Sequence, residues 1–298
     1  MSTAVRTPRP VAALVVVAMD EEARPFLDTL APLDDVDEVP LLGIARAWSL
    51  ALPGAAAAGG GERATVETVG PDAEPDDGRA DAAASGPHAE PDNGSDGGRP
   101  AGPRELVLVR SGIGLVSAAS ALATALTRLA PAVVLSAGTA GGLGREVEVG
   151  DVCVSTTLAY TDADATAFGY AHGQTPGQPA VFEADAAVLA RVEEVGPAAL
   201  RASTASSGGA RIRAGQMLAG NSFVTAANVG RARELFPGAV STDMESTALA
   251  QVAASAGIPF ASVRGVSDLC GPEAGQDFHI GADEAAARSA AVVLAALG

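Results

Sequence analysis

Short runs of branched apolar residues recur along the chain and alternate with longer Ala-rich segments. The run VAALVVVAM at 11–19 is apolar at every position, which is typical of a strand buried on both faces. The Ala-rich segment 282–297 favours a helix. The pattern predicts strands at 11–19, 105–110, 132–137, 150–157, 215–220, 239–242 and 258–266, and helices at 21–31, 115–130, 185–195, 226–235, 244–257 and 282–297.

The alternation of buried strands with helices indicates an α/β fold, with helices on both faces of a central sheet. In such folds ligands bind at the carboxyl ends of strands. Polar and acidic groups recur directly after the predicted strands, in the segments MDEE, SGIG, GTAGG, NSF, DME and SD. We therefore expect a site at one rim of the sheet, with acidic groups and without a basic cluster.

The pattern breaks between residues 53 and 103, where Gly, Pro, Ala and Asp dominate and large apolar residues are almost absent. Such a segment cannot offset the entropy lost on ordering, so we predict a disordered low-complexity insertion. It interrupts a predicted β-hairpin, between ARAWSLALPG and RELVLVRSGIG, because neither flank looks able to fold alone. Residues 1–298 are therefore expected to form a single domain. A second loose stretch, 203–215, is predicted to be a loop.

Composition excludes several classes of protein. Apolar residues make up 48% of the 298 residues, enough for a large core, and the formal net charge of −17 repels phosphate backbones and anionic membrane surfaces. We expect no nucleic-acid or membrane partner. The first apolar run is too short to span a bilayer. Two cysteines and three histidines lack the spacing of metal ligands, so we expect a reduced, cytoplasmic protein without a metal site.

Glycine-rich segments give weak signals. SGIG at 111–114 lacks the full dinucleotide-binding pattern, and the next strand ends without the acidic ribose ligand of that fingerprint. No phosphate-binding GK[ST] motif is present. GTAGGLG at 138–144 follows a predicted strand, where glycine more often marks a tight turn than a ligand contact.

The segment STDMESTALAQVA places two carboxylates, Asp243 and Glu245, where a strand runs into a helix. Thr242 and Glu245 have the spacing of a capping box, in which hydroxyl and carboxylate bind free N–H groups at a helix start. A capping box is therefore enough to explain the polar residues of this segment when it is considered by itself.

Two further carboxylates allow the same kind of interpretation. Glu22 lies in MDEE, where acidic groups favour a helix N-terminus, and Asp268 lies in SDLCG, where it could cap a turn. Together with Glu245 they follow three strand ends and would meet in one pocket. Carboxylates in unlike environments divide into acid and base, as hydrolysis through an oxocarbenium-like transition state requires.

Several segments carry a family resemblance. The stretch 136–185, which contains DADATAFGY and GQTPGQPA, resembles the central segment of bacterial 5′-methylthioadenosine/S-adenosylhomocysteine nucleosidases. AMDEE, SGIGLVSAA, AGNSFVT, TDMESTALAQVA and VRGVSDLCG are similar to further motifs of this family, in the family's order. The resemblance covers nearly the whole chain except 53–103. The resemblance implies one α/β/α domain around a mixed sheet, and a homodimer without metal or cofactor. The implied reaction is hydrolysis of the N-glycosidic bond of both nucleosides.

The resemblance also implies roles for individual residues. Asp268, oriented by Ser267, matches the acid that protonates adenine N7, and Glu22 matches the base that activates water. Glu245, placed by Arg264, matches the group that binds the ribose hydroxyls.

Further residues would bind the substrate. Met244 would pack beside the sugar, Phe223 would stack on adenine, and the backbone of Val224 would bind the Watson–Crick edge. Ile113 would line the alkylthio end, joined across the dimer by Phe168 of a second copy.

Three positions depart from the family pattern. Thr139 stands where Ser is usual, which keeps the hydroxyl. Asp243 stands where Glu is usual, which shortens the reach of that carboxylate. Phe278 has the spacing of the family's lid residue, but alignment through Asp283 and Glu284 would place Ala282 there instead.

Three other functions remain open. A hydrolase for a futalosine-type nucleoside would need room for a larger, more polar 5′ group, against which Ile113 and Phe168 argue. A phosphorylase would carry an arginine three residues before Thr139, where Ser136 stands. A nucleoside-binding module without catalysis could still retain the three carboxylates.

Overall fold

The computed structural model describes residues 7–33, 38–53, 104–270 and 280–298, and all of them belong to one compact unit. The strands are β1 Arg9–Val11, β2 Ala13–Val17, β3 Arg46–Leu52, β4 Arg104–Arg110, β5 Leu129–Pro131, β6 Val134–Gly142, β7 Val152–Tyr160, β8 Phe182–Glu183, β9 Ile212–Ala219, β10 Ala239–Asp243 and β11 Phe260–Asp268. The helices are α1 Asp20–Thr29, α2 Leu115–Leu126, α3 Ala186–Ser203, α4 Val229–Leu235, α5 Ser246–Ala256 and α6 Ala282–Leu297, with 3₁₀ turns η1 Thr166–Phe168 and η2 Ser207–Gly209.

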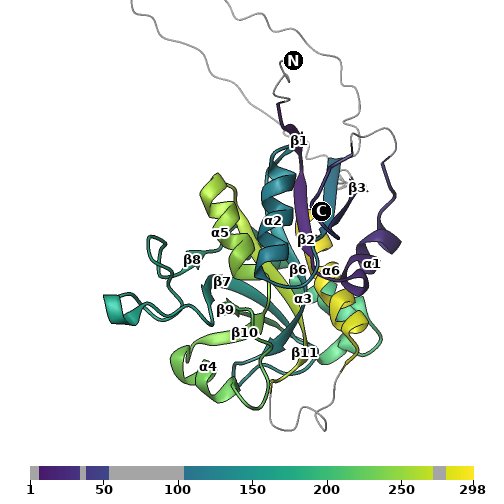
Figure 1. Ribbon diagram of the computed structural model, residues 1–298. Coiled ribbons are helices and arrows are strands. Elements are labelled where there is room, and N and C mark those ends of the chain that lie inside the picture. The colour runs from purple at the N-terminus through teal and green to yellow at the C-terminus, as the bar shows by residue number, and fades with distance from the viewer. Residues whose placement is uncertain (1–6, 34–37, 54–103, 271–279) are drawn as a thin grey trace, which may run out of the picture. The chain divides into compact units, whose positions relative to one another are not determined.

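Nine of the described strands form one mixed sheet. Eight of them follow the order β10-β9-β7-β11-β6-β2-β4-β3, and β8 pairs with Thr157 and Leu158 of β7. Strands β4, β2, β6 and β11 run parallel to one another, and β7 runs antiparallel to β11. Strand β10 pairs with β9 and also with β6, so that β6, β11, β7, β9 and β10 form a closed ring (Figure 1). The sheet is therefore open on the β3 side and closed into a barrel on the other.

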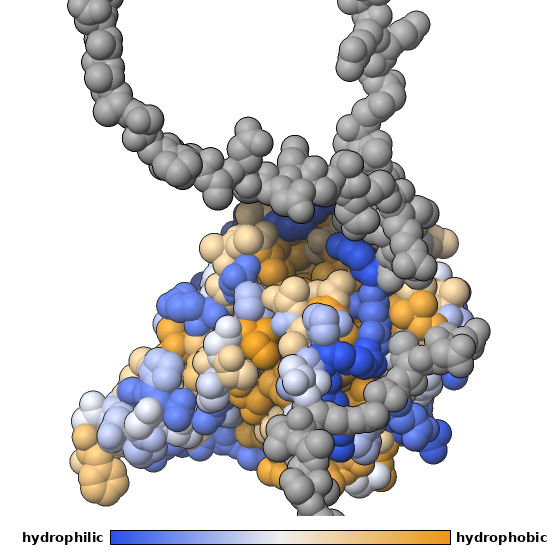
Figure 2. Space-filling model, turned by 90° about the horizontal axis from the view of Figure 1, so that it is seen from above, coloured by the Kyte–Doolittle hydropathy of each residue, from blue (hydrophilic) through white to orange (hydrophobic). Residues whose placement is uncertain are grey.

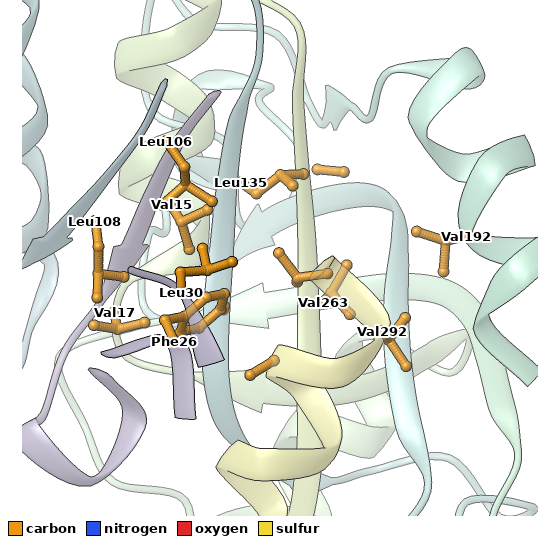
Figure 3. Packing of buried hydrophobic residues seen from close by; sticks show 14 of the residues in the cluster. Val15, Val17, Phe26, Leu30, Leu106, Leu108, Leu135, Val192, Val263 and Val292 are labelled. Atoms are coloured by element: carbon orange, nitrogen blue, oxygen red, sulfur yellow. The ribbon is translucent and has the colours of Figure 1, made fainter. Parts of the chain in front are cut away.

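Helices cover both faces of the sheet. Along β2, Val15 and Val17 face a core with α1, α3 and α6, whereas Leu14 and Val16 face a core with α2 and α5. Figure 3 shows the first core, in which Val15 and Val17 lie near Phe26 of α1. Because every residue of β2 is buried, its run of branched apolar residues fits a position between two layers. The predicted three-layer α/β/α fold is confirmed.

Most predicted elements are present, with differences at their ends. Helix α6 has the predicted bounds of 282–297. The predicted loop at 203–215 is partly wrong, because β9 begins at Ile212 and pairs with β7. The turn expected for 138–144 is also wrong, since β6 continues to Gly142. No signal marked the short β1 and β5, which pair with each other.

The predicted insertion lies outside the described residues, except for Pro53. The described residues do show what flanks it: β3 and β4 form an antiparallel pair in which Leu52 lies opposite Arg104. The predicted hairpin pairing of the two flanking strands is therefore confirmed.

We propose that this segment is an insertion that the domain does not need. Deletion of residues 55–101 with a short turn in their place should leave turnover unchanged. The free energy of unfolding should stay the same or rise by up to about 2 kcal/mol, because each doubling of loop length costs about 0.6 kcal/mol. Urea unfolding and turnover of both proteins test this, and a large loss of either quantity would contradict it.

Candidate active site

The closed part of the sheet brings strand ends together. At the end of β6, Gly141 pairs with Thr242 of β10 on one side and with Asp268 of β11 on the other. A Cβ at Gly141 would lie 2.2 Å from Sγ of Cys270 and 3.3 Å from Oδ1 of Asp268, so only glycine permits this approach. The polar segments after the strands therefore meet at one place, as expected.

A cavity opens at this place. It is lined by ten of the residues selected from the sequence, namely Glu22, Ile113, Thr139, Phe223, Val224, Met244, Glu245, Arg264, Ser267 and Asp268. Sequence reasoning gave no binding role to eight other lining residues, namely Ala18, Met19, Ala140, Gly141, Ser222, Thr242, Asp243 and Cys270. Phe168 is 83% exposed on η1 and does not line this cavity. Phe278 lies outside the described residues.

Glu22 is buried, with a relative exposure of 1%, and both of its oxygens accept hydrogen bonds. Oε2 accepts from the backbone N–H groups of Ala18 at 2.7 Å and Met19 at 3.2 Å. Oε1 accepts from the N–H of Thr139 at 2.8 Å and from its hydroxyl at 3.0 Å. The helix-start interpretation is therefore correct but incomplete, because the same carboxylate is also held by β6 and faces the cavity.

Gly138 forms the wall against which Glu22 packs. Its φ of +132° lies in a region open to glycine, and a Cβ there would lie 2.4 Å from Oε1 of Glu22. Its N–H donates to Oγ of Ser289 on α6 at 3.1 Å, and the same hydroxyl donates to the carbonyl of Val263 on β11 at 2.7 Å. Ser289 is fully buried, so its hydroxyl joins two strands under the site.

Ser289→Ala should therefore lower the free energy of unfolding by about 1–3 kcal/mol, because the buried N–H of Gly138 loses its acceptor. Ser120→Ala is the matched control, since the Ser120 hydroxyl donates only to the carbonyl of Ser117 in its own helix. It should change stability by less than about 0.5 kcal/mol. Urea unfolding measures the stability of both variants. Equal losses would show that the hydrogen bond from Gly138 to Ser289 makes no specific contribution to stability.

Glu245 and Arg264 form a buried ion pair across the cavity floor. Nη1 of Arg264 lies 3.2 Å from Oε2 of Glu245 and donates also to the carbonyl of Thr139, while Nη2 donates to Oγ of Ser136 at 2.8 Å. The N–H of Gly114 donates to Oε1 of Glu245 at 2.8 Å. The expected placement of Glu245 by Arg264 is therefore present in the structure.

Burial raises the pKa of Glu245 to about 7; Arg264 opposes this effect, and the carboxylates of Asp243 and Glu22 add to it. Burial alone would lower the pKa of Arg264, but the same three carboxylates together raise it. A ligand whose hydroxyls donate to Glu245 would favour its ionised form.

Asp243 has the capping role that the sequence analysis gave to Thr242. Strand β10 continues to Asp243, and α5 begins only at Ser246. Oδ1 of Asp243 accepts from the N–H groups of Glu245 at 2.8 Å and Ser246 at 2.7 Å. The predicted capping box of Thr242 is wrong, because the side chain of Asp243, and not that of Thr242, accepts from the N–H groups at the start of the helix.

Asp243 also lies near Arg264, without a hydrogen bond to it. Its Oδ1 lies 3.7 Å from Nη2 of Arg264, outside normal hydrogen-bond distance. Among the described residues, Oδ2 of Asp243 and Nε of Arg264 are both buried without a hydrogen-bond partner. Asp243 therefore orients the start of α5, and Glu245 is the carboxylate that bonds to Arg264.

Asp268 ends β11 and is held at both oxygens. The hydroxyl of Ser267 donates to Oδ2 at 3.0 Å, and the N–H of Cys270 donates to Oδ1 at 3.0 Å. The orientation by Ser267 was expected, whereas the bond from Cys270 was not. Nothing in the sequence marked Cys270, because its contribution is a backbone group that any residue carries.

Part of the cavity wall is apolar, and two of its side chains are exposed. Phe223 and Ile113 are 70% and 57% exposed, and Val224 is almost buried. Asn228 orders this wall, since its amide donates to the carbonyl of Phe223 and its oxygen accepts from the N–H of Thr225. An aromatic face beside ordered backbone groups suits a flat, polar-edged ring.

Comparisons with known proteins agree with this geometry. The model of the phosphorylase superfamily matches residues 101–298. The 5′-methylthioadenosine/S-adenosylhomocysteine nucleosidase of Actinobacillus succinogenes is 37% identical over 195 residues, which are 65% of this chain and 81% of that protein. The chain belongs to this nucleosidase family. The corresponding nucleosidase of Anoxybacillus flavithermus is 37% identical over 189 residues, covering 63% of this chain and 78% of that protein.

A solved structure supports the same membership. The nucleosidase from Neisseria meningitidis, in complex with methylthio-immucillin-A, has a TM-score of 0.70 and is 28% identical, with 96% of this chain and 97% of that chain covered. The family resemblance drawn from the sequence motifs is confirmed.

Three further findings concern the part of the nucleosidase that the structure describes. No group of three or more His, Cys, Asp or Glu side chains among these residues is placed to hold a metal ion. Helices long and apolar enough to cross a membrane are absent from the same residues. Both cysteines are buried free thiols.

Proposed function

We propose that this nucleosidase hydrolyses the N-glycosidic bonds of 5′-methylthioadenosine and S-adenosylhomocysteine, and releases adenine and the corresponding thioribose. The observation that carries the proposal is the convergence of Glu22, Glu245 and Asp268 on one cavity that has an aromatic wall. Relatives that share more than a third of their aligned residues with this chain are nucleosidases named for the same two substrates.

Substrate binding uses two sides of the cavity. Glu245 accepts hydrogen bonds from the ribose hydroxyls while Arg264 holds its second oxygen, and Met244 packs beside the sugar. Phe223 stacks on adenine, and the backbone of Val224 binds the polar edge of the ring. These assignments rest on the position of each residue in the cavity wall and on the family motif that contains it.

Bond cleavage needs a proton for the leaving group. Asp268 protonates N7 of adenine as the bond between C1′ and N9 breaks, so that its electrons leave with a neutral base. The sugar passes through an oxocarbenium-like state with positive charge. Of the charged groups that line the cavity, Glu22, Asp243, Glu245 and Asp268 are acidic and Arg264 alone is basic, which favours that charge.

Water completes the reaction. Glu22 removes a proton from a water molecule, whose oxygen then bonds to C1′ of the sugar. Four donors, from Ala18, Met19 and Thr139, keep the carboxylate of Glu22 in one orientation. A fixed carboxylate can orient water without reorganisation during the reaction.

The same cavity argues against phosphate as the nucleophile. A phosphorylase needs a cation that is free to bind phosphate, and Arg264 is the single basic residue among those that line the cavity. Its guanidinium is already engaged by Glu245, the Thr139 carbonyl and Ser136. Ser136 stands at the position of the phosphorylase arginine. Its side chain is fully buried and accepts a hydrogen bond from Arg264.

Adenine release from a panel of nucleosides tests the proposal. We expect turnover of methylthioadenosine and adenosylhomocysteine at a rate that does not depend on phosphate. Strict phosphate dependence would indicate a phosphorylase, and a preference for futalosine would indicate the related hydrolase. Tight binding of methylthioadenosine without product, measured by calorimetry, would indicate a binding module.

We further propose that two copies associate and that Phe168 reaches the second copy's cavity. Four large apolar side chains are more than half exposed, namely Leu42, Ile44, Ile113 and Val116. Ile44 packs against Gly112, which is the residue before Ile113 in the chain. The segment between β7 and β8, which carries η1, projects from the body in Figure 1 and ends in an apolar tip in Figure 2. Sedimentation equilibrium tests the association, and a monomer at micromolar concentration would contradict it.

A further inference from the structure

Arg233 on α4 joins two segments that border the cavity. Its Nε donates to the carbonyl of Leu143 at 3.0 Å, and its Nη2 donates to the carbonyl of Leu269 at 3.1 Å. Leu143 follows the end of β6, and Leu269 follows Asp268 at the end of β11. An exposed arginine with two backbone acceptors therefore fixes the strand ends that carry the site.

The bond to Leu269 acts on Asp268 through one peptide unit. The carbonyl of Leu269 and the N–H of Cys270 belong to the same planar peptide, which is trans. In a trans peptide these two groups point in opposite directions. Arg233 holds the carbonyl end of this plane, and the N–H end donates to Oδ1 of Asp268 at 3.0 Å. A rotation of the plane would break both bonds at once.

The conformation of Cys270 leaves this peptide in need of support. Cys270 is the single non-glycine residue with positive φ in the described chain, at +55°. L-residues rarely adopt this region, so the surrounding contacts must hold it. The Cys270 side chain is buried against the cluster that contains Leu143 and Val224, and Gly141 leaves space for its sulfur. Arg233 supplies the remaining fixed point, at the peptide itself.

We propose that Arg233 is a positioning residue for Asp268, which rests on the proposed function. Arg233 is not among the residues that line the cavity. It orients the Leu269–Cys270 peptide, whose N–H donates to Oδ1 of Asp268. The other oxygen, Oδ2, accepts from the hydroxyl of Ser267. The polarised peptide also makes a stronger N–H donor, because Arg233 withdraws electron density from its carbonyl.

Arg233→Met keeps the methylene stem and removes both donors. We expect kcat to fall about tenfold with KM within a factor of two, because a small displacement of a catalytic group is costly. The melting temperature should change little, since Arg233 is exposed. Arg231→Met is the matched control, because Arg231 is exposed on the same helix and bonds to neither carbonyl, and its kcat should stay within a factor of two.

A second variant separates geometry from charge. Arg233→Lys keeps the positive charge but cannot direct two donors at two carbonyls. Its kcat should lie between those of the unmodified enzyme and R233M, and it serves in place of R233M if that variant does not fold. A kcat equal to that of the unmodified enzyme would show that charge alone suffices, and would overturn the geometric role.

A double-mutant cycle identifies the route of the effect. In an Asp268→Asn background, R233M should not lower the residual rate further, since the group that it positions is already inactive. An equal decrease in both backgrounds, or an unchanged kcat in R233M alone, would overturn the proposal. If the unmodified enzyme releases no adenine, the proposed function fails; if it is active and R233M is fully active, only the role of Arg233 fails.

Discussion

Asp268→Asn is expected to keep the fold and to lower kcat by about 10² to 10⁴, the usual contribution of a general acid or base. Asparagine has the same shape, and its amide cannot deliver a proton to adenine N7. Its oxygen can still accept the N–H of Cys270, and the Ser267 hydroxyl can turn to accept from the new amide. Stability should therefore change little, and the loss of rate would be chemical.

The test compares kcat and the melting temperature of Asp268→Asn with those of the unmodified enzyme. Asp185→Asn provides the control, because Asp185 is a helix-capping carboxylate that accepts from the N–H groups of Ala187 and Val188. Asparagine also caps helices well, so this variant should keep its rate. A near-normal rate in Asp268→Asn would remove Asp268 from the mechanism.

Glu22→Gln is expected to stop hydrolysis by a similar factor of about 10² to 10⁴ while substrate binding survives. The water loses its base, and the groups that bind ribose and adenine are unchanged. Unlike the first variant, this one should also lose stability. Each oxygen of Glu22 accepts from at least one backbone N–H group, and such a group cannot turn into an acceptor, so the new amide must face at least one donor. The free energy of unfolding should fall by about 1–3 kcal/mol.

Glu21→Gln is the matched control in the same helical turn, because Glu21 is exposed and makes no hydrogen bond in the described structure. It should leave both rate and stability nearly unchanged. Calorimetry with methylthioadenosine and urea unfolding separate binding from folding. A Glu22→Gln variant with normal stability and normal rate would show that Glu22 is not the base and that its ionised form is not needed for stability.

Local sequence determined most of the elements. Strand β2 could be predicted because all of its residues are branched or small apolar ones, and a strand that packs on both faces needs no alternation. Helix α6 could be predicted with its full bounds, because its Ala-rich pattern ends at a glycine on both sides. The family motifs, from AMDEE to VRGVSDLCG, indicated the family and ten of the residues that line the cavity.

Tertiary pairing decided how these residues meet. Strands β6 and β10 run in opposite directions, so their ends would lie at opposite rims of a flat sheet. They meet because β10 pairs with both β9 and β6, and this ring is closed by residues far apart in the chain. No local pattern encodes such a pairing. The strand character of 138–142 follows from the same closure, since β10 and β11 supply its hydrogen-bond partners.

The finer details of the site also depend on position in space. Sequence spacing made Thr242 a helix cap, but α5 begins only at Ser246, and Asp243 accepts from the N–H groups at its start. Cys270 and Ser289 hold the site through a backbone N–H and a buried hydroxyl. Such groups occur throughout any chain, so residue type alone cannot select them. The sequence thus determined which carboxylates are available, and the closed sheet decided which atoms hold them, because hydrogen bonds depend on distances that only the folded chain fixes.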